Sequence, residues 1–183
     1  MNAPIDVTNI RIESERLILR SWKMSDLDTF YQHAFDREDS ADSSAERPPI
    51  SMFENILSRI IDEKKQFAII LKETEAVIGS LGLQPRHVDT GFADELHGRE
   101  ISYGLFKDYR GKGYMTEAVD AVCKYCFDQL HYDYLTCGYF DGNDKSKRVM
   151  ERCGFVWLKD IDTVVKPGET IPGKLYVRYQ PNK

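Results

Sequence analysis

The most constraining feature of the sequence is a short basic turn, Arg110–Gly113 (RGKG), between two segments of different periodicity. Before the turn, Glu100–Phe106 (EISYGLF) has the pattern of a strand, and after it apolar residues recur at helical spacing from Ala118 to Leu130. A helix N-terminus presents unpaired N–H groups, and glycines let a backbone approach a ligand closely. The segment therefore predicts a strand–turn–helix anion site, with a tight solvated turn as the alternative.

The spacing of this turn differs from two common nucleotide-binding motifs. It contains neither the Walker A pattern G-x-x-x-x-G-K-[ST] nor the dinucleotide pattern G-x-G-x-x-G. A P-loop nucleotidase and a dinucleotide-binding Rossmann domain are therefore disfavoured.

Periodicity along the chain predicts one mixed α/β domain over residues 1–183, in the order β-α-α-β-β-β-α-β-α-β-β. The expected strands are Arg16–Arg20, Phe67–Leu71, Ala76–Leu83, Glu100–Phe106, Tyr134–Phe140, Phe155–Leu158 and Leu175–Tyr179. The expected helices begin at Ser25 as N-cap, after Pro49, after Gly113 and at Asn143, the last ending with Gly154 at C′. Pro167-Gly168 and Pro172-Gly173 predict a long connection between the last two strands, and residues 36–46 and 86–98 are expected to be loops.

Net charge and hydropathy argue against several classes of protein. The formal net charge of −5 argues against a general nucleic-acid binder, which usually carries a basic excess. No apolar run approaches the ~20 residues that span a bilayer. The N-terminal stretch MNAPIDVTNIRIESE also lacks the apolar core of a secretory signal. We therefore expect a cytoplasmic protein with neither membrane nor nucleic-acid partners.

The four cysteines raise the alternative of metal or redox chemistry, because Cys123 and Cys126 have C-x-x-C spacing. Both fall inside a helical apolar pattern, where cysteine behaves as a small buried hydrophobe. Neither a second C-x-x-C nor a histidine cluster follows, so we expect core residues and no metal. Cys137 and Cys153 complete a set of free thiols that fits a reducing compartment.

Two longer segments carry a family resemblance. FKDYRGKGYMTEAV, and NDKSKRVMERCGF about thirty residues later, resemble the GNAT acetyltransferase superfamily. Arg110 and Gly113 hold the positions of its acyl-CoA loop R/Q-x-x-G-x-G/A, whereas Met115 stands where Gly or Ala is usual. The opening ESERLILRSWKMSDLDTF is similar to the ribosomal-protein N-acetyltransferase branch, so the resemblance covers about residues 11–160.

The resemblance implies a GNAT fold, with a central, twisted, mostly antiparallel sheet, a splayed pair of parallel strands and about four flanking helices. It implies acetyl-CoA as cosubstrate and no metal. Pantetheine would lie between the strands Glu100–Phe106 and Tyr134–Phe140. Lys147 or Arg148 would be candidates for the 3′-phosphate, with solvated charges on a helix as the favoured alternative. The implied cofactor-binding residues are Leu105, Phe106, Arg110, Gly111, Lys112, Gly113, Tyr114, Met115, Asn143 and Ser146.

The resemblance also implies two catalytic roles. Glu100 lies where many GNAT enzymes place a general base, with a solvent-facing strand residue as the alternative. Many members use a tyrosine as acid, but Met150 occupies that position here. Ser146, one turn earlier, is therefore the nominated acid, with a first-turn cap as its alternative. A backbone N–H near Leu105 would stabilise the oxyanion.

The expected acceptor is a primary amine, and the branch resemblance suggests a protein N-terminus, as in a ribosomal protein. A small amine or amino acid stays open, because one fold hosts many acceptors. The acidic segment 36–46 would favour a cationic acceptor if it faced the site. Two rival interpretations are a non-enzymatic acyl-CoA sensor and a different phosphate-ligand protein that shares only the RGKG turn. A homodimer also stays open.

Overall fold

The computed structural model describes residues 2–33, 48–85, 90–93, 95–166 and 169–181. The expected loop 36–46 lies outside these residues, as does part of the expected loop 86–98. The chain divides into two compact units: unit 1 comprises residues 1–4, 82–102 and 115–183, and unit 2 comprises residues 5–81 and 103–114.

The predicted mixed α/β architecture is confirmed, with one further short strand at the start. The strands are β1 Arg11–Glu13, β2 Leu17–Ser21, β3 Gln66–Leu71, β4 Val77–Gln84, β5 Gly98–Leu105, β6 Tyr134–Phe140, β7 Val156–Lys166 and β8 Glu169–Tyr179. The helices are α1 Leu27–His33, α2 Ile50–Glu63, α3 Tyr114–Asp128 and α4 Asp144–Arg152, with 3₁₀ turns at Met24–Asp26 and Lys107–Tyr109. The strand order is β1-β2-β3-β4-β5-β6-β8-β7, mostly antiparallel, with β5 and β6 parallel.

Unit 2 is built around the alternation of β2 and β3. Leu17 and Leu19 are fully buried and pair with Leu71 and Ile69 across the antiparallel ladder. The amphipathic helix α2 covers a neighbouring cluster through Leu57. The buried members of that cluster are Trp22, Leu57, Ala68, Ile70 and Val77.

The turn between β2 and α1 differs from the predicted Ser25 cap, which was wrong. The N-cap is Lys23, and Ser25 lies inside the 3₁₀ turn. Arg20 and Asp26 form a two-bond ion pair with both N···O distances at 2.8 Å, and Asp26 also accepts from the Lys23 N–H at 2.9 Å. The carboxylate of Asp26 therefore takes the capping role, because the planar guanidinium holds it in place.

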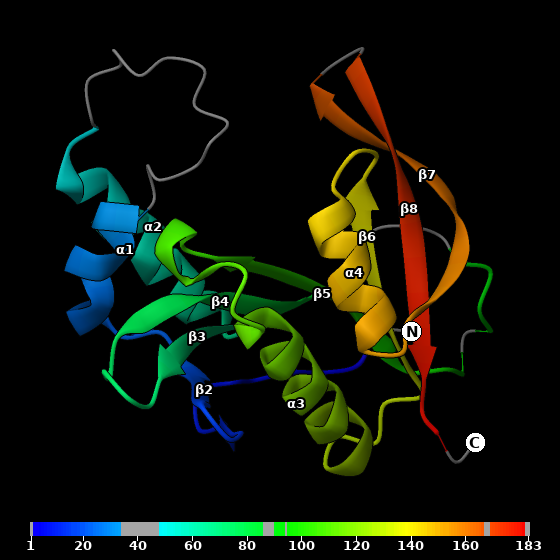
Figure 1. The fold of residues 1–183 in the computed structure, drawn as a ribbon, viewed down its shortest axis with the longest axis horizontal. Helices are drawn as coiled ribbons and strands as arrows, with labels where there is room; N and C mark the ends of the chain where they lie inside the picture. Colours follow the sequence, from blue (N-terminus) through cyan, green and yellow to red (C-terminus); the bar gives the residue numbers. More distant parts are fainter. Residues whose placement is uncertain (1, 34–47, 86–89, 94, 167–168, 182–183) are drawn as a thin grey trace. The chain divides into compact units, whose positions relative to one another are not determined.

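Unit 1 holds β6, β8 and β7, with α3 and α4. Figure 1 shows β7 and β8 as a long hairpin. Arg178 on β8 bonds Asp120 on α3 at 3.1 Å and lies over the ring of Phe127, which ties the helix to the sheet. Helix α4 stops where predicted: Gly154 has φ +75°, and the Phe155 N–H donates to Met150 O at 3.0 Å, as in a Schellman motif.

The predicted long connection between the last two strands was wrong. Both strands are longer than expected, and Pro172-Gly173 lies inside β8, paired with Asp162 and Ile161. The carbonyl of Pro172 accepts from the Asp141 N–H at 2.9 Å, so its backbone faces away from β7 and the missing proline N–H costs no β7 bond. Gly173 packs so closely on the Tyr139 carbonyl that a Cβ would clash there.

The cysteines occupy the core, as predicted. All four are buried free thiols. Burial is the largest effect on the pKa of Cys123 and of Cys153 and raises these values to about 12 and about 11. Among the described residues, no group of three or more His, Cys, Asp or Glu side chains could hold a metal. Within the same residues, no helix is both long and apolar enough to cross a membrane.

Candidate functional site

The basic turn adopts a conformation that its glycines make possible. After the 3₁₀ turn, Gly111 and Gly113 take φ values of +79° and +82°, and α3 begins at the next residue, Tyr114. This left-handed region is costly for residues with a Cβ and open to glycine. Apart from Gly111 and its two chain neighbours, no described residue has an atom within 4 Å of the point where a Cβ on Gly111 would stand, so backbone conformation rather than crowding requires that glycine.

The two cations of the turn fold back onto its base. Arg110 Nε donates to the Leu105 carbonyl at 3.0 Å, and Lys112 Nζ donates to the Asp108 carbonyl, also at 3.0 Å. Both residues are exposed. They add positive charge beside exposed backbone at a helix N-terminus, the combination that favours an anion.

Sequence reasoning missed one residue at this turn. Arg16 Nη1 donates to the Lys112 carbonyl at 3.1 Å, and its guanidinium carbon lies 4.6 Å from the ring centroid of Tyr114. No local pattern could have revealed it, because the contact joins residues 96 positions apart.

The backbone at Leu105 and Phe106 is only partly available to a ligand. The Phe106 N–H donates to the Ile78 carbonyl at 2.9 Å. Because N–H groups alternate along a strand, the Leu105 N–H points to the opposite edge of β5. The ring of Phe106 stacks on His33 of α1, with centroids 4.0 Å apart and planes at 11°. Leu105 therefore offers its N–H, whereas Phe106 is engaged at both backbone and ring.

Glu100 belongs to unit 1, on the part of β5 that pairs with β6. Its partner in the parallel ladder is Thr136, so the two side chains leave the same face of the sheet. Glu100 is half-buried, and solvent does not reach its Oε2. Thr136 is fully buried, and within the described residues its hydroxyl has no hydrogen-bond partner. A carboxylate with an inaccessible oxygen differs from an ordinary solvent-facing strand glutamate.

Asn143 and Ser146 form the N-terminus of α4, also in unit 1. Asn143 Oδ1 accepts from the Ser146 N–H at 3.1 Å, an N-cap bond that leaves the Asn143 amide group as a donor. Asn143 is exposed and Ser146 is half-buried. Met115 and Met150, which replace the usual residues of the family pattern, are both buried core side chains.

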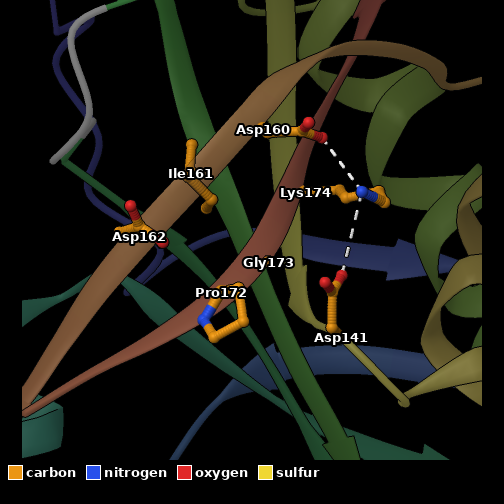
Figure 2. Close-up of a pocket in the computed structure, with 7 residues that line it drawn as sticks. All are labelled: Asp141, Asp160, Ile161, Asp162, Pro172, Gly173 and Lys174. Atoms are coloured by element: carbon orange, nitrogen blue, oxygen red, sulfur yellow. Dashed lines mark hydrogen bonds and ion pairs between the residues drawn. The ribbon is translucent and has the colours of Figure 1, made fainter.

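A separate hollow lies between β6, β7 and β8 (Figure 2). It has a volume of about 200 Å³ and is lined by Asp141, Asp160, Ile161, Asp162, Pro172, Gly173 and Lys174. Lys174 Nζ lies 3.0 Å from Asp160 Oδ1 and 3.9 Å from Asp141 Oδ1, as the dashed lines in Figure 2 show. The bond to Asp160 is the main reason that the pKa of Lys174 is raised. None of the predicted site residues lines this hollow.

The site residues thus fall into two groups. Leu105, Phe106 and Arg110 to Tyr114 belong to unit 2, whereas Glu100, Met115, Asn143 and Ser146 belong to unit 1. Within unit 2, Arg16 is hydrogen-bonded to the turn. Within unit 1, Glu100 is paired with Thr136 in the parallel ladder, and Asn143 is hydrogen-bonded to Ser146.

Comparison with known proteins gives a consistent result. Residues 16–156 match the acetyltransferase (GNAT) domain family. The chain is 31% identical over 156 residues to a probable N-acetyltransferase, YjcK, of Bacillus subtilis strain 168, covering 83% of this chain and 77% of that protein.

Solved structures show the same fold. A GNAT-family acetyltransferase from Bacillus anthracis superposes with a TM-score of 0.78 at 20% identity, covering 93% of this chain and 99% of that one. A ribosomal L7/L12 α-N-protein acetyltransferase, RimL, in complex with coenzyme A has a TM-score of 0.74 at 14% identity, covering 95% and 100%.

Proposed function

Because this chain belongs to the GNAT acetyltransferase family, whose members use acetyl-CoA, we propose that it acetylates the N-terminal amine of a protein. The activity itself, N-acetyl transfer from acetyl-CoA, follows from family membership and from relatives that are named N-acetyltransferases. Two observations support the acceptor: the chain opens like the ribosomal-protein branch, and one structural neighbour is a ribosomal-protein N-terminal acetyltransferase.

The turn Arg110–Tyr114 is the observation that carries the cofactor proposal. Two glycines in the left-handed region expose backbone immediately before the 15-residue helix α3. In the proposal, amides from Gly111 to Met115 bind the pyrophosphate, and Arg110 and Lys112 add charge. The remaining pantetheine contacts are assigned to the Leu105 N–H and to the amide group of Asn143.

The transfer is proposed to be direct. Glu100 takes the proton of the acceptor ammonium, itself or through a water molecule, and leaves a neutral amine. The amine nitrogen bonds to the thioester carbonyl carbon, and the Leu105 N–H stabilises the oxyanion. The carbon–sulfur bond then breaks, and the CoA thiolate takes a proton from Ser146 or from solvent. The nitrogen of the new amide gives up its extra proton to the Ser146 alkoxide or to solvent, which completes the proton balance. A thiol pKa of ~8.5 makes the thiolate a good leaving group, so Ser146 contributes less than Glu100.

The decisive experiment is a thiol-release assay with acetyl-CoA and a matched acceptor panel. Peptides beginning with Ser, Ala or Met would be compared with the same peptides blocked at the N-terminus and with spermidine and free lysine. We expect turnover on the free peptides and none on the blocked ones. Turnover confined to small amines would overturn the acceptor proposal, and CoA binding without any turnover would favour a sensor.

A single catalytic domain over residues 1–183 and a cytoplasmic location stay predictions, and a homodimer stays open. Light scattering can determine the oligomeric state, and cell fractionation can determine the location.

A further inference from the structure

The side chain of Arg16 lies along the turn that leads into α3. Its Nη1 donates to the Lys112 carbonyl at 3.1 Å, and its guanidinium carbon is 4.6 Å from the centroid of the Tyr114 ring. Its Nη2 lies 3.5 Å from the point at which a Cβ on Gly113 would stand. Arg16 thus contacts Lys112 and Tyr114 and lies near the glycine between them, at the start of the helix.

The backbone of Arg16 is itself held in place. It sits in a turn where the Ser14 N–H donates to Leu17 O at 3.0 Å and the Leu17 N–H donates to Ser14 Oγ at 3.2 Å. The Arg16 carbonyl accepts from the Lys72 N–H at 2.9 Å, immediately after β3. The side chain therefore extends from a fixed point, which reduces the entropy lost in ordering it.

The bond to the Lys112 carbonyl determines how the next amide faces. The described residues contain no cis peptide bonds, and in a trans peptide the C=O and the following N–H point in opposite directions. A carbonyl of Lys112 turned toward Arg16 therefore turns the Gly113 N–H away from it. That N–H is one of the groups assigned to the pyrophosphate.

We propose that Arg16 is a positioning residue for the pyrophosphate of acetyl-CoA, holding the Lys112–Gly113 peptide and adding positive charge beside it. The inference rests on the proposed role of the turn. Arg110 and Lys112 direct their cationic groups to the carbonyls of Leu105 and Asp108, so Arg16 is the residue whose guanidinium braces the helix end of the turn. A lysine at position 16 would keep the positive charge but would lack the planar guanidinium that lies over the Tyr114 ring.

A series of truncated ligands tests this role by calorimetry. CoA, dephospho-CoA and pantetheine would be titrated into the wild type, Arg16→Lys, Arg16→Ala and the control Arg11→Ala. Arg11 is exposed and paired with Glu13 on β1 at 2.9 Å. For Arg16→Ala we expect Kd to rise about 10- to 100-fold for CoA and equally for dephospho-CoA, the loss typical of a hydrogen bond to a charged group. Pantetheine affinity should not change, Arg16→Lys should recover only part of the loss, and Arg11→Ala should resemble the wild type.

Several outcomes would overturn the inference. A loss confined to CoA would place Arg16 at the 3′-phosphate, and an equal loss for pantetheine would mean general damage to the site. Full recovery of CoA affinity in Arg16→Lys would show that the positive charge alone matters. If Arg16→Ala does not fold, Arg16→Lys still provides the test. Unchanged affinities in both Arg16 variants would reject the positioning role of Arg16 and leave the proposed function standing. A wild type that fails to bind CoA would reject the proposed function itself.

Discussion

Glu100 and Thr136 occupy paired positions on the parallel strands β5 and β6, and each carries a side-chain oxygen that solvent does not reach. The hydroxyl of Thr136 has no partner among the residues that the structure describes. Burial of such a group opposes folding. The energetic cost of this buried hydroxyl beside the proposed base can be measured directly.

Thr136→Val replaces the buried hydroxyl with a methyl group of similar shape. We expect the free energy of unfolding in urea to rise by about 1 kcal/mol, because an unsatisfied buried polar group is removed. The matched variant Thr136→Ser keeps the hydroxyl and loses a buried methyl, so it should be less stable by about 1 kcal/mol. A clear loss of stability in Thr136→Val would mean that the hydroxyl has a bonding partner in solution.

Glu100→Gln removes the proposed base while keeping the shape of the side chain. We expect kcat to fall by about 10²–10⁴ with CoA affinity unchanged, the usual contribution of a positioned base. The deficit should shrink above about pH 8, where an N-terminal amine is already neutral. Activity assays at a series of pH values would measure this deficit, with Glu151→Gln, at an exposed position, as the control. Ser146→Ala should lose less activity than Glu100→Gln. Full activity in Glu100→Gln would contradict the assignment.

Gly113→Asp tests the turn as the phosphate site. A carboxylate and a Cβ beside the phosphates should abolish the rise in Tm with acetyl-CoA, which for the wild type we expect to be about 5–10 °C at saturation. Gly91→Asp provides a matched control, because Gly91 also has a positive φ, +70°, with no atom within 4 Å of the point where its Cβ would stand. Both variants carry similar backbone strain, so only Gly113→Asp should lose the ligand response. Normal CoA binding by a folded Gly113→Asp would remove the turn from the site.

Asp120→Asn tests the link between α3 and β8. Burial raises the pKa of Asp120, but hydrogen bonds from Arg178 and Lys124 outweigh it and lower the pKa overall. A lowered folded-state pKa means that the stabilisation is present above the ordinary carboxylate range and is lost as pH falls through the folded value. Because the side chain is 39% exposed, solvent screening limits the expected loss at pH 7 to about 0.5–1 kcal/mol. Urea unfolding should show this loss shrinking as pH falls below the ordinary carboxylate range, and a constant difference at all pH values would argue against an electrostatic origin.

The buried cysteines should be unreactive in the native protein. Burial raises the pKa of Cys123, Cys126 and Cys153, which suppresses the thiolate that reacts. We expect Ellman's reagent to detect almost no thiol before denaturation and all four after it. Metal analysis should find no stoichiometric zinc, and chelators should leave Tm unchanged. One zinc per chain would instead assign Cys123 and Cys126 to a metal site.

Local pattern determined much of this protein. Period-two and period-3.6 repeats revealed the strands and helices, the paired glycines revealed the turn before α3, and Gly154 marked the end of α4. These features could be predicted because each depends on neighbours only a few positions away. That holds for the buried face of a strand or helix, for a residue in the left-handed region and for the end of a helix.

Tertiary structure decided the features that depend on distant partners. The length of the β7–β8 hairpin depends on Pro172 facing Asp141, the residue that follows β6, and the cap before α1 depends on Arg20 holding Asp26. Thr136 lies beside Glu100 only because two strands pair in parallel register, and Arg16 reaches Lys112 across 96 residues. Such contacts leave no local periodic signal, because they are created when the chain folds and brings separate segments together.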